Sequence, residues 1–591
     1  MRRHKLMKKW NRALLPLCIV IAFSTAPTGA SAETPGVKVS TVDEIAAAMK
    51  KAQPGDTIVM KNGVWKDAAV VVEGEGKENK PITLRAETPG QVFLTGSSTL
   101  NIGGSYLTVD GLVFKDGGDI DDSGVIEFKV GDVEASHSRL TNIQMIDYNP
   151  ASNETNTKWV GLYGDHNRVD HSYFKGKKNI GATMVVWREK VGENYHQIDH
   201  NYFAGRPILR DNKGQVVSNE AETLRIGTST HSLTDSYTTV ETNLFENNDG
   251  EIEMMSIKSG KNVINGNTFL NNAATVTLRH GNGSHIENNF FLANGKANAG
   301  AIRVIGEDHV IANNYISGIV GSNATRGAIT MTNGIPNSDL NKYFQVKNVT
   351  IANNTLVNNE NNIIVGDKKS ATNSLAPAGT VLMNNLVVAS GKGTLPLIKV
   401  LDDSAELKYE GNFMYGAELG IEPVEGITVQ DPKLTLASDG IYRTSPQSPA
   451  IKAWNSESQA AVTNQPLQPK DVGPEWLKGF EYGKIYLEAN GKAVTVEKEP
   501  FIASERTMVP VSVIQQTLGA EIKGDAKSSE VTISLKGKTI VLKISDTPEA
   551  EAQVKQGTVF VPVRKVVESL AAKVEWTPDY KQIANLITIT P

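Results

Sequence analysis

One short pattern recurs through the middle of this chain: an alternating apolar run ends in asparagine, and an apolar residue follows. The eight segments are HQIDHNYF, TVETNLF, VINGNTF, HIENNFF, VIANNYI, TIANNTL, VLMNNLV and KYEGNFM, with the asparagines at Asn201, Asn243, Asn267, Asn289, Asn314, Asn354, Asn385 and Asn412. Successive asparagines are 42, 24, 22, 25, 40, 31 and 27 residues apart. Self-similarity of this kind is typical of a solenoid, in which each repeat packs against its neighbours.

The repeats are short, β-branched runs bounded by turn residues, which predicts strands rather than helices. Intervals of 22–25 residues fit an all-β fold, a right-handed parallel β-helix with three short strands per coil. The longer intervals then mark coils with loop insertions. A single asparagine would indicate an ordinary turn, but eight in one context predict an internal ladder, with amides hydrogen-bonded along the ~4.8 Å strand spacing.

Charged residues follow the ladder asparagine of their own coil at similar distances. Glu251, Glu253 and Lys258 follow it by 8, 10 and 15 residues, Arg279 by 12 and Arg303 by 14. We therefore expect them on neighbouring strands of one sheet. Glu251 and Glu253 are two residues apart, so strand alternation would place them on one face.

Two interpretations of this cluster stay open. Surface salt bridges between strands are common and weak, so any isolated Glu–Lys pair is most simply structural. The segments NEAETLRIG and TLRHG, however, add Asn219, Glu222, Arg225 and His280. Oxygen donors from Asn219, Glu251 and Glu253 are of the type that calcium takes, and a cation would relieve the repulsion between the carboxylates.

The segment NLFENNDGEIEMMSIKS, with LRHG 21 positions beyond its lysine, resembles polysaccharide lyase family 6, which contains alginate lyases and chondroitinase B. AQPGDTIVMKNGVWKD and PITLRAETPGQVFLTGSSTLNIGGSYLTVDGLVF resemble the start of that family, and KDVGPEW resembles its end. The resemblance covers residues 38–476. It departs from the family pattern after Asn219, where NEAE stands in place of a glycine pair.

The resemblance implies a role for each residue of the cluster. It makes Asn219, Glu251 and Glu253 calcium ligands, Lys258 the Brønsted base and Arg279 its catalytic partner, and it places Glu222, Arg225, His280 and Arg303 against substrate. The residue types suit β-elimination from a uronate, because a cation at the C6 carboxylate stabilises the charge that develops when a base removes the C5 proton. Glycoside hydrolysis would need two carboxylates flanking the bond and no lysine.

Several functions remain open at this point. The first expectation is a calcium-dependent lyase that acts on alginate, because no extra basic cluster suggests sulfate binding. Dermatan sulfate is the second substrate. The non-enzymatic alternative is a glycan-binding β-helix adhesin, which would not need a lysine base. The net charge of −5 gives no broad basic surface for nucleic acid.

Both ends of the chain differ from the repeats. A basic stretch, the apolar run ALLPLCIVIAF and the small residues ASA predict a signal peptide at 1–32, hence secretion and no membrane anchor in the mature chain. The lyase domain is then expected at 33–476. Cys18, the one cysteine, would be lost with the signal peptide, which leaves no disulfides.

Residues 477–591 carry a second repeat, VPVSVIQQTLGAEI and VPVRKVVESLAAKV, offset by 52. Each copy predicts a strand end running into an amphipathic helix. This part resembles the copper amine oxidase N-terminal-like domain, a stalk module. Copper binding is not expected, because no histidine or cysteine follows residue 476. A spacer role, or association with the cell wall, the cell surface or carbohydrate, is expected instead; the alternative is a domain that only stabilises the end of the β-helix.

Overall fold

The computed structural model describes residues 36–591 apart from 121–123, 212, 218, 322, 390–394, 455–463, 479–483, 505, 546, 548 and 581–583. The signal peptide expected at 1–32 lies outside the described residues. Within those residues, no helix combines the length and apolarity needed to cross a membrane.

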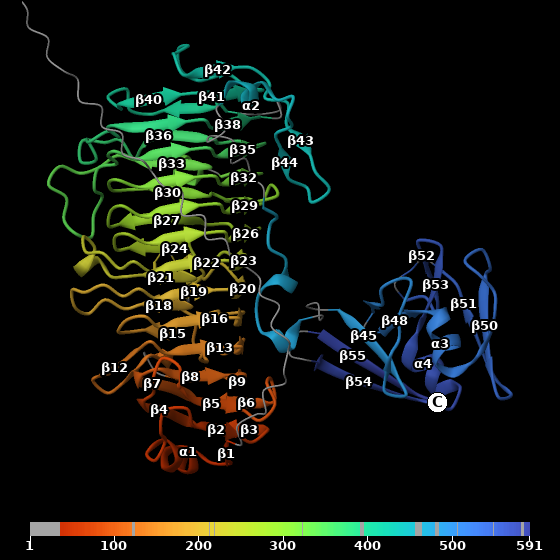
Figure 1. The fold of residues 1–591 in the computed structure, drawn as a ribbon. Coiled ribbons are helices and arrows are strands. Elements are labelled where there is room, and N and C mark those ends of the chain that lie inside the picture. Colours follow the sequence, from red (N-terminus) through yellow and green to blue (C-terminus); the bar gives the residue numbers. More distant parts are fainter. Residues whose placement is uncertain are drawn as a thin grey trace, which may run out of the picture. The chain divides into compact units, whose positions relative to one another are not determined.

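The described chain up to Val429 winds into three long sheets, which confirms the parallel β-helix (Figure 1). Helix α1 (Val42–Met49) packs Ile45 and Met49 onto the core of the first coil. The strands are paired in parallel throughout, apart from the antiparallel β11–β12 pair. Each coil contributes a strand to each sheet, so residues far apart in sequence become lateral neighbours.

The first sheet contains, in spatial order, β1 (Val37–Val39), β2 (Thr57–Met60), β5 (Ile82–Ala86), β8 (Leu107–Asp110), β13 (Arg139–Thr141), β16 (Arg168–Asp170), β19 (Gln197–Asp199), β22 (Thr239–Glu241), β25 (Val263–Asn265), β28 (His285–Glu287), β31 (Val310–Ala312), β34 (Thr350–Ala352), β37 (Thr380–Met383) and β40 (Leu407–Glu410). The second contains β11 (Lys129–Val130), β12 (Val133–Ser136), β7 (Thr99–Ser105), β10 (Gly124–Glu127), β15 (Lys158–Leu162), β18 (Met184–Val186), β21 (Leu224–Ile226), β24 (Glu253–Lys258), β27 (Thr275–His280), β30 (Ile302–Val304), β33 (Ile329–Thr332), β36 (Ile363–Asp367) and β39 (Ile398–Val400), with β4 (Ala69–Glu75) paired to β7. The third contains β3 (Gly63–Lys66), β6 (Val92–Gly96), β9 (Leu112–Gly117), β14 (Gln144–Ile146), β17 (Tyr173–Lys175), β20 (Tyr202–Arg206), β23 (Leu244–Asn248), β26 (Thr268–Leu270), β29 (Phe290–Leu292), β32 (Tyr315–Ser317), β35 (Thr355–Val357), β38 (Leu386–Val388), β41 (Asn412–Tyr415) and β42 (Ile427–Val429).

The asparagine ladder is present as predicted. The Asn201 amide donates to Asn243 Oδ1 at 3.1 Å, and six further links of 2.9–3.0 Å continue it through Asn267, Asn289, Asn314, Asn354, Asn385 and Asn412. All eight side chains are fully buried. A stack of phenylalanines runs beside them, with ring centroids 4.6–5.2 Å apart from Phe174 to Phe291.

A left-handed residue precedes each ladder asparagine. The φ angle is +58° at Asn288, +56° at Asn313 and +57° at Asn353, and glycine takes this place at Gly266 and Gly411. Asparagine and glycine tolerate this conformation better than other residues. The two residues of each Asn-Asn pair therefore differ in role: the first adopts the left-handed conformation of the turn, and the second hydrogen-bonds in the ladder.

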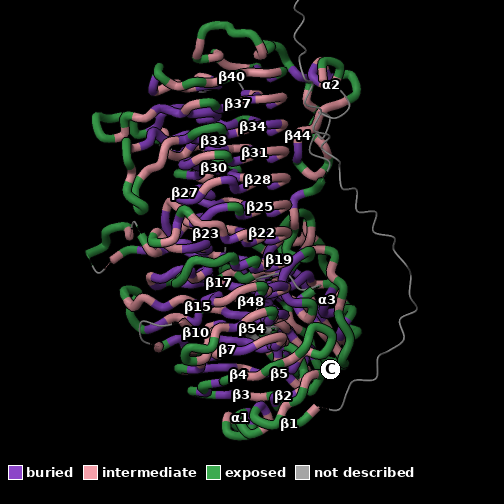
Figure 2. The backbone as a smooth tube through the Cα atoms, turned by 60° about the vertical axis from the view of Figure 1, so that its left-hand side comes forward, coloured by how far each residue is buried: buried purple, intermediate pink, exposed green. Residues whose placement is uncertain are grey.

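Buried residues line the inside of the coils along their whole length, while the exposed residues concentrate in the loops (Figure 2). The two longest intervals between ladder asparagines hold long loops, which flank β21 between β20 and β22 and occupy residues 333–349 between β33 and β34. This agrees with the prediction that long intervals carry loops.

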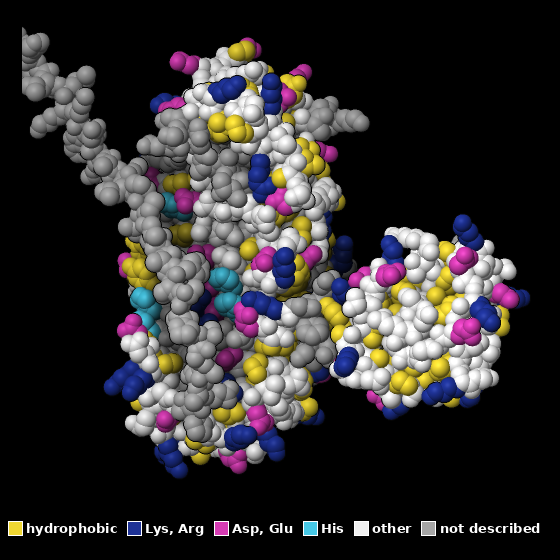
Figure 3. All heavy atoms as spheres, turned by 45° about the vertical axis from the view of Figure 1, so that its right-hand side comes forward, with side chains coloured by type: hydrophobic (Ala, Val, Ile, Leu, Met, Phe, Trp, Pro, Cys, Tyr) yellow, Lys and Arg dark blue, Asp and Glu magenta, His cyan; other side chains and the backbone are white. Residues whose placement is uncertain are grey.

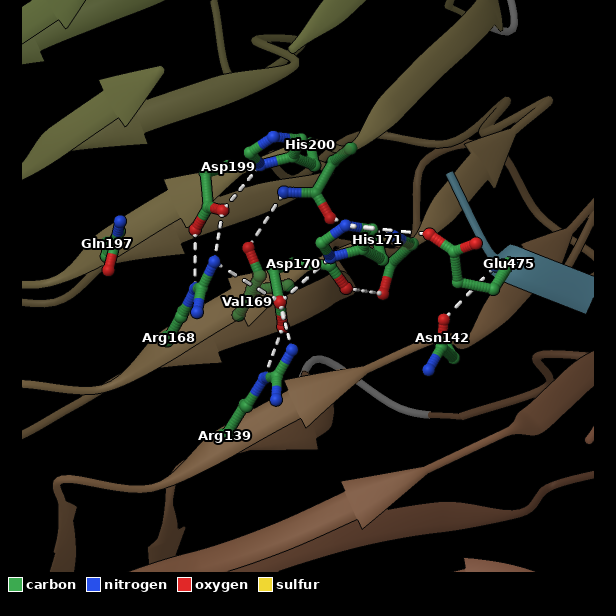
Figure 4. A network of polar contacts seen from close by, with 12 residues as sticks. Arg139, Asn142, Arg168, Val169, Asp170, His171, Gln197, Asp199, His200 and Glu475 are labelled. Carbon is green, nitrogen blue, oxygen red and sulfur yellow. Dashed lines mark hydrogen bonds and ion pairs between the residues drawn. The ribbon is translucent and has the colours of Figure 1, made fainter. Parts of the chain in front are cut away.

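After β42 the chain forms a small hairpin and a short helix, which are β43 (Thr435–Leu436), β44 (Tyr442–Arg443) and α2 (Pro449–Ala453). The segment 464–477 then returns along the coils toward the N-terminal end. Its backbone N–H groups at Leu467 and Gly473 donate to Thr268 Oγ1 and to the His200 carbonyl, at 2.8 and 2.7 Å. Trp476 Nε1 donates to the Asn142 carbonyl at 3.0 Å. Glu475 of this segment approaches a stack of arginine, aspartate and histidine residues on the first sheet (Figure 4).

Residues 484–591 have a hydrophobic core of their own, built from both copies of the second repeat. In each copy a strand runs directly into a helix, as predicted: β48 (Arg506–Pro510) into α3 (Val511–Leu518), and β53 (Thr558–Pro562) into α4 (Val563–Ser569). The elements are β45 (Ile485–Ala489), β46 (Lys492–Ala493), β47 (Phe501–Ala503), β48 (Arg506–Pro510), α3 (Val511–Leu518), β49 (Glu521–Lys523), β50 (Glu530–Leu535), β51 (Lys538–Lys543), β52 (Gln553–Lys555), β53 (Thr558–Pro562), α4 (Val563–Ser569), β54 (Lys573–Tyr580) and β55 (Ala584–Thr590). They form sheets in the orders β46-β45-β55-β54, β47-β48-β53-β52 and β49-β50-β51.

Candidate active site

The charged residues singled out in the sequence meet on four neighbouring strands of the second sheet. Arg225 in β21 pairs with Ser256 in β24, Ser256 with Thr277 in β27, and Thr277 with Arg303 in β30. Lys258 is the partner of His280, after a shift of the register between Ile257 and Lys258. Residues 78 positions apart in the chain thus form one lateral row, because the coils stack in register.

Three carboxylates gather beside this row. Glu222 is almost fully buried, at 1% exposure, and its Oε2 has no hydrogen-bond partner among the described residues. Glu251 accepts a hydrogen bond from the Ala221 N–H at 3.2 Å. Burial raises the pKa of Glu251 well above its usual range, and the negative charges of Glu222 and Glu253 raise it further. Among the described residues no ion pair reaches Glu251, although cations pair with Glu222 and Glu253.

The expected reason for the pairing of Glu251 and Glu253 is wrong in detail. Strand β24 begins at Glu253, so Glu251 lies before the strand and strand alternation does not align the two. The bend at Gly250 and Glu251 and the hydrogen bond from Ala221 hold Glu251 in place. The two carboxylates come together because Glu251 lies at the end of a loop and Glu253 begins the strand that follows it.

Four cationic side chains surround the carboxylates. The ion pairs are Lys258 Nζ–Glu222 Oε1 at 3.5 Å, Arg225 Nη1–Glu222 Oε1 at 3.9 Å, Arg279 Nε–Glu253 Oε1 at 3.6 Å and Arg303 Nη1–Glu253 Oε1 at 3.3 Å. These separations are long for charge-assisted hydrogen bonds. Charges of both signs are therefore paired only loosely across the row. In a salt-bridge cluster that served stability alone, we would expect shorter ion-pair distances.

His280 contributes a neutral ring to the site. Burial lowers the pKa of His280 to about 3, and the positive charges of Arg279 and Lys258 lower it further. Its imidazole is thus uncharged at neutral pH and can donate or accept a hydrogen bond without adding charge.

Two buried cations lie behind the carboxylates. The Arg206 guanidinium donates to the carbonyls of Glu222, Asn179 and Gly181 at 2.9–3.2 Å. Lys177 Nζ donates to the carbonyl and the amide oxygen of Asn179, at 3.0 and 2.8 Å. Burial lowers the pKa of Arg206 to about 10, and Glu222 and Glu251 oppose that shift. Arg206 binds the backbone that carries Glu222, and Lys177 binds the Asn179 segment to which Arg206 also donates, so the two side chains support the position of Glu222.

The insertion 333–349 supplies residues that the sequence patterns did not reveal. The ring of Tyr343 lies 4.6 Å from the Arg279 guanidinium and 5.6 Å from that of Arg303, centroid to Cζ. Arg279 Nη1 also donates to the Lys342 carbonyl at 2.7 Å. Burial would raise the pKa of Tyr343, but Arg303, Lys368 and Arg279 hold it below its usual value. The 40-residue interval between ladder asparagines was the available sign that a loop of this coil could reach the site.

A tryptophan closes the other side of the row. The Arg225 guanidinium lies 5.2 Å from the Trp187 ring and the Lys158 ammonium 5.8 Å from it. Tyr163 stacks on Trp187 with centroids 6.1 Å apart. Aromatic faces next to cations are suited to hold a sugar ring and its acidic group at once.

Asn219 occupies an exposed position three residues before Glu222. In the described part of the chain, no hydrogen bond or ion pair joins its side chain to the cluster. The following residue, Glu220, has a φ of +64°, a conformation that favours glycine. This is the place where the sequence departs from the family pattern.

The carboxylate cluster can be tested as a cation site on its donors. Its donors are oxygen atoms, and one of them, Glu222 Oε2, is a buried carboxylate oxygen without a hydrogen-bond partner among the described residues. Hard cations such as calcium take such ligands. The ligand atoms of the three glutamates are not all within 4.8 Å of one another, however; in the described part of the chain, the side chains that meet this spacing are those of His137, Asp165 and His166.

Comparison with known proteins resolves the relationship of the chain. The family profile described as Chondroitinase B matches residues 39–456, which is well over half of the sequence. The chain belongs to the chondroitinase B family. A second profile, the copper amine oxidase N-terminal domain, matches residues 488–548. No match was found among curated proteins.

Solved structures agree with membership of the chondroitinase B family. The PL6 family alginate lyase AlyGC is 39% identical, with a TM-score of 0.69, over 77% of this chain and 62% of that protein. This chain therefore spans less than two thirds of that relative. A mannuronic acid specific polysaccharide family 6 lyase from human gut microbiota is 28% identical, with a TM-score of 0.58, over 67% of this chain and 91% of that one. The alginate lyase AlyF-OU02, solved with G6, is 26% identical, with a TM-score of 0.59, over 75% and 97%.

Proposed function

We propose that the protein is a secreted, calcium-dependent lyase that cleaves a uronate-containing polysaccharide by β-elimination. The observation that carries the proposal is the placement of Lys258 and Arg279 on adjacent strands beside the buried carboxylates. A glycan-binding site needs charge and aromatic faces, but it does not need a lysine that can accept a proton. The family relationship and the similarity to solved alginate lyases support the same class of substrate.

The residues divide between holding the substrate and moving a proton. Glu251, Glu253 and Asn219 would hold calcium, which supplies positive charge to the C6 carboxylate of the uronate. Arg225, His280 and Arg303, with Glu222, line the same row and orient the sugar. Orientation of this kind lowers the entropic part of the barrier.

Lys258 Nζ takes the proton from C5, and the electron pair of that C–H bond forms the new C4=C5 bond as the C4–O4 bond breaks. Arg279 stabilises the negative charge on the departing O4 or supplies its proton. The new non-reducing end is a 4,5-unsaturated uronate. General-base catalysis of this kind contributes roughly 10²–10⁴-fold to a rate.

Alginate is the preferred substrate. Two arginines, Arg225 and Arg303, line the row and can pair with the carboxylate that each uronate carries. Dermatan sulfate is the second candidate, favoured by the family profile.

The direct test incubates the protein with polymannuronate, polyguluronate and dermatan sulfate and follows the ultraviolet absorbance of the conjugated C=C–COO⁻ product. We expect absorbance to rise with one or both alginate polymers, to disappear in excess chelator and to return with calcium more fully than with magnesium, whose octahedral preference fits this loop-and-strand cluster less well. Saturated products with new reducing ends would show hydrolysis and contradict the proposal. Binding to alginate without any cleavage would support the adhesin alternative.

A further inference from the structure

The domain formed by residues 484–591 contains a hollow of about 670 Å³. Its lining comes from two stretches of the sequence: the β47–β48 hairpin, and the run from the end of β53 through α4 to the paired strands β54 and β55. The size lies in the range of small-ligand sites, about 300–1,000 Å³. We call this hollow the C-terminal groove.

The floor of the C-terminal groove is apolar. Val574 and Trp576 alternate along β54 and so share a face, and Ile587 is the register partner of Trp576 on β55. Val563 of α4 and Ile502 of β47 complete the floor. Ile502 is 59% exposed, so the domain keeps apolar surface in contact with water. Figure 3 shows hydrophobic side chains gathered on this domain, with lysines and arginines spread toward its edges.

The rim of the C-terminal groove is mainly cationic. Arg506, Arg564 and Lys565 line it together with one acid, Glu568. Lys565 already pairs with Glu551 at 2.9 Å, outside the groove. Arg564 is exposed on this rim, and its guanidinium can hold a carboxylate through two parallel hydrogen bonds.

We propose that the C-terminal groove binds a segment of a uronate-bearing polysaccharide and so holds the enzyme on its polymer. The half-buried Trp576 side chain and its aliphatic neighbours offer an apolar floor for the C–H face of a pyranose ring, and Arg564 on the rim meets the acid group that each uronate carries. Charge complementarity favours this occupant over a neutral glycan or an acidic-to-neutral peptide, which would not use the floor and the rim together. The existence of the groove is independent of the function proposed above; the choice of an acidic glycan rests on it.

The test uses the full-length chain on crosslinked polymannuronate beads, in a Lys258→Ala background with chelator present so that the polymer stays intact. Arg564→Glu is the first variant, because Arg564 is exposed and its replacement leaves the core alone. We expect its dissociation constant for the beads to rise at least about tenfold, the range of one lost charge-assisted contact. Lys538→Glu makes the same change of charge on β51, a strand that does not line the groove, and should change binding less than about twofold.

Trp576→Ala is the second variant, with Trp576→Phe as its conservative partner, and circular dichroism confirms folding for each. Alanine should weaken binding as strongly as Arg564→Glu, and phenylalanine should restore most of it. Binding of Arg564→Glu and Trp576→Ala within twofold of the parent overturns the proposal, as does equal retention on uncharged dextran beads.

A parallel assay separates this proposal from the lyase itself. With Lys258 present, Arg564→Glu should cleave short soluble oligosaccharides at the parental rate, because the substitution lies outside the lateral row that contains Lys258. If every variant, including the parent, lacks lyase activity while the bead assay still distinguishes Arg564→Glu from Lys538→Glu, the lyase function fails and the groove stands.

Discussion

Two stacks of charge lie on different sheets of the same β-helix, and they are built in opposite ways. On the first sheet, arginines and aspartates from successive coils pair one to one (Figure 4). On the second sheet, three glutamates gather among four cations; Glu253 accepts a hydrogen bond from Ser256 Oγ at 2.7 Å, but every ion pair of the cluster is 3.3 Å or longer. Because the scaffold and the coil spacing are the same, the difference lies in the side chains.

The stack on the first sheet is saturated. Arg139 Nε donates to Asp170 Oδ1 at 2.9 Å, and Arg168 Nε donates to Asp199 Oδ1 at 2.8 Å; each arginine makes a second bond to the same carboxylate. His171 Nδ1 lies 2.9 Å from Asp170. Burial alone would raise the pKa of Asp170, but His171 and Arg139 hold it well below its usual range.

The stack on the second sheet is unsaturated. Its ion pairs measure 3.3–3.9 Å, the Glu222 Oε2 atom has no partner among the described residues, and the pKa of Glu251 is raised. Asp170 and Glu251 are both buried carboxylates on a β-helix face, yet their pKa values move in opposite directions. A buried carboxyl with a raised pKa and no ion pair of its own among the described residues indicates a site for an outside cation.

The largest expected effect separates catalytic from structural charge. Lys258→Ala should lower kcat about 10³-fold, because a general base acts in the transition state. Its melting temperature should change little, since the pair with Glu222 is long at 3.5 Å. Lys347→Ala, a half-exposed lysine 4.0 Å from Glu307, is the matched control. A Lys258→Ala enzyme that retains a tenth of the parental kcat would remove Lys258 from the role of base.

The saturated stack should respond through stability. Asp170→Asn keeps the shape but leaves Arg139 and His171 without their carboxylate, which should lower the free energy of unfolding by about 3 kcal/mol. Denaturant unfolding followed by circular dichroism measures this. The specific activity of the folded fraction should be unchanged, and a loss below about 1 kcal/mol would show that the bidentate pairs contribute little.

The unsaturated stack should respond with the opposite sign. In chelator, Glu251→Gln should raise the free energy of unfolding by about 2 kcal/mol, because it removes one of several buried like charges. The same variant should lose the stabilisation that calcium gives to the parent. If Glu251→Gln destabilises the chelated protein, the carboxylates are compensated within the chain and the comparison fails.

The smallest effect concerns pH. Because the pKa of His280 is about 3 in the fold and near 6.5 in the unfolded chain, the unfolded state alone binds a proton between these values, so stability falls as pH drops below 6.5. At pH 5.5 the loss is about 1.4 kcal/mol. The difference in unfolding free energy between parent and His280→Gln should therefore shift by this amount between pH 7.5 and 5.5. A difference that stays constant with pH would show that the folded state also protonates His280.

The ladder and the lateral row on β21, β24, β27 and β30 could be predicted from the sequence, because a repeated local pattern fixes their positions. Once Asn243, Asn267 and Asn289 fix the register, Lys258, Arg279 and Arg303 fall on adjacent strands. Tyr343 was not accessible, because its position depends on where a long insertion folds rather than on any period. Arg206 and Lys177 were also missed, since they bind backbone carbonyls, and a carbonyl carries no sequence signature.

The position of Glu251 shows a different limit. The sequence placed it correctly beside Glu253 but for the wrong reason, since the start of β24 could not be located to within two residues. Strand ends depend on tertiary hydrogen bonds such as the one from Ala221. The sequence therefore predicted which residues lie together better than it predicted how the backbone holds each of them there.

The asparagine ladder has a directional consequence. In every link the amide of the earlier coil donates to the amide oxygen of the later coil, from Asn201 to Asn412. The side-chain dipoles therefore point the same way and add along the axis of the solenoid, as peptide dipoles add in an α-helix. Each amide also polarises the next, so a link in the middle has two neighbours that strengthen it and a terminal link has one. The interior of the coils from Asn201 to Asn412 is therefore electrically polar along its axis, although every amide of the ladder is neutral.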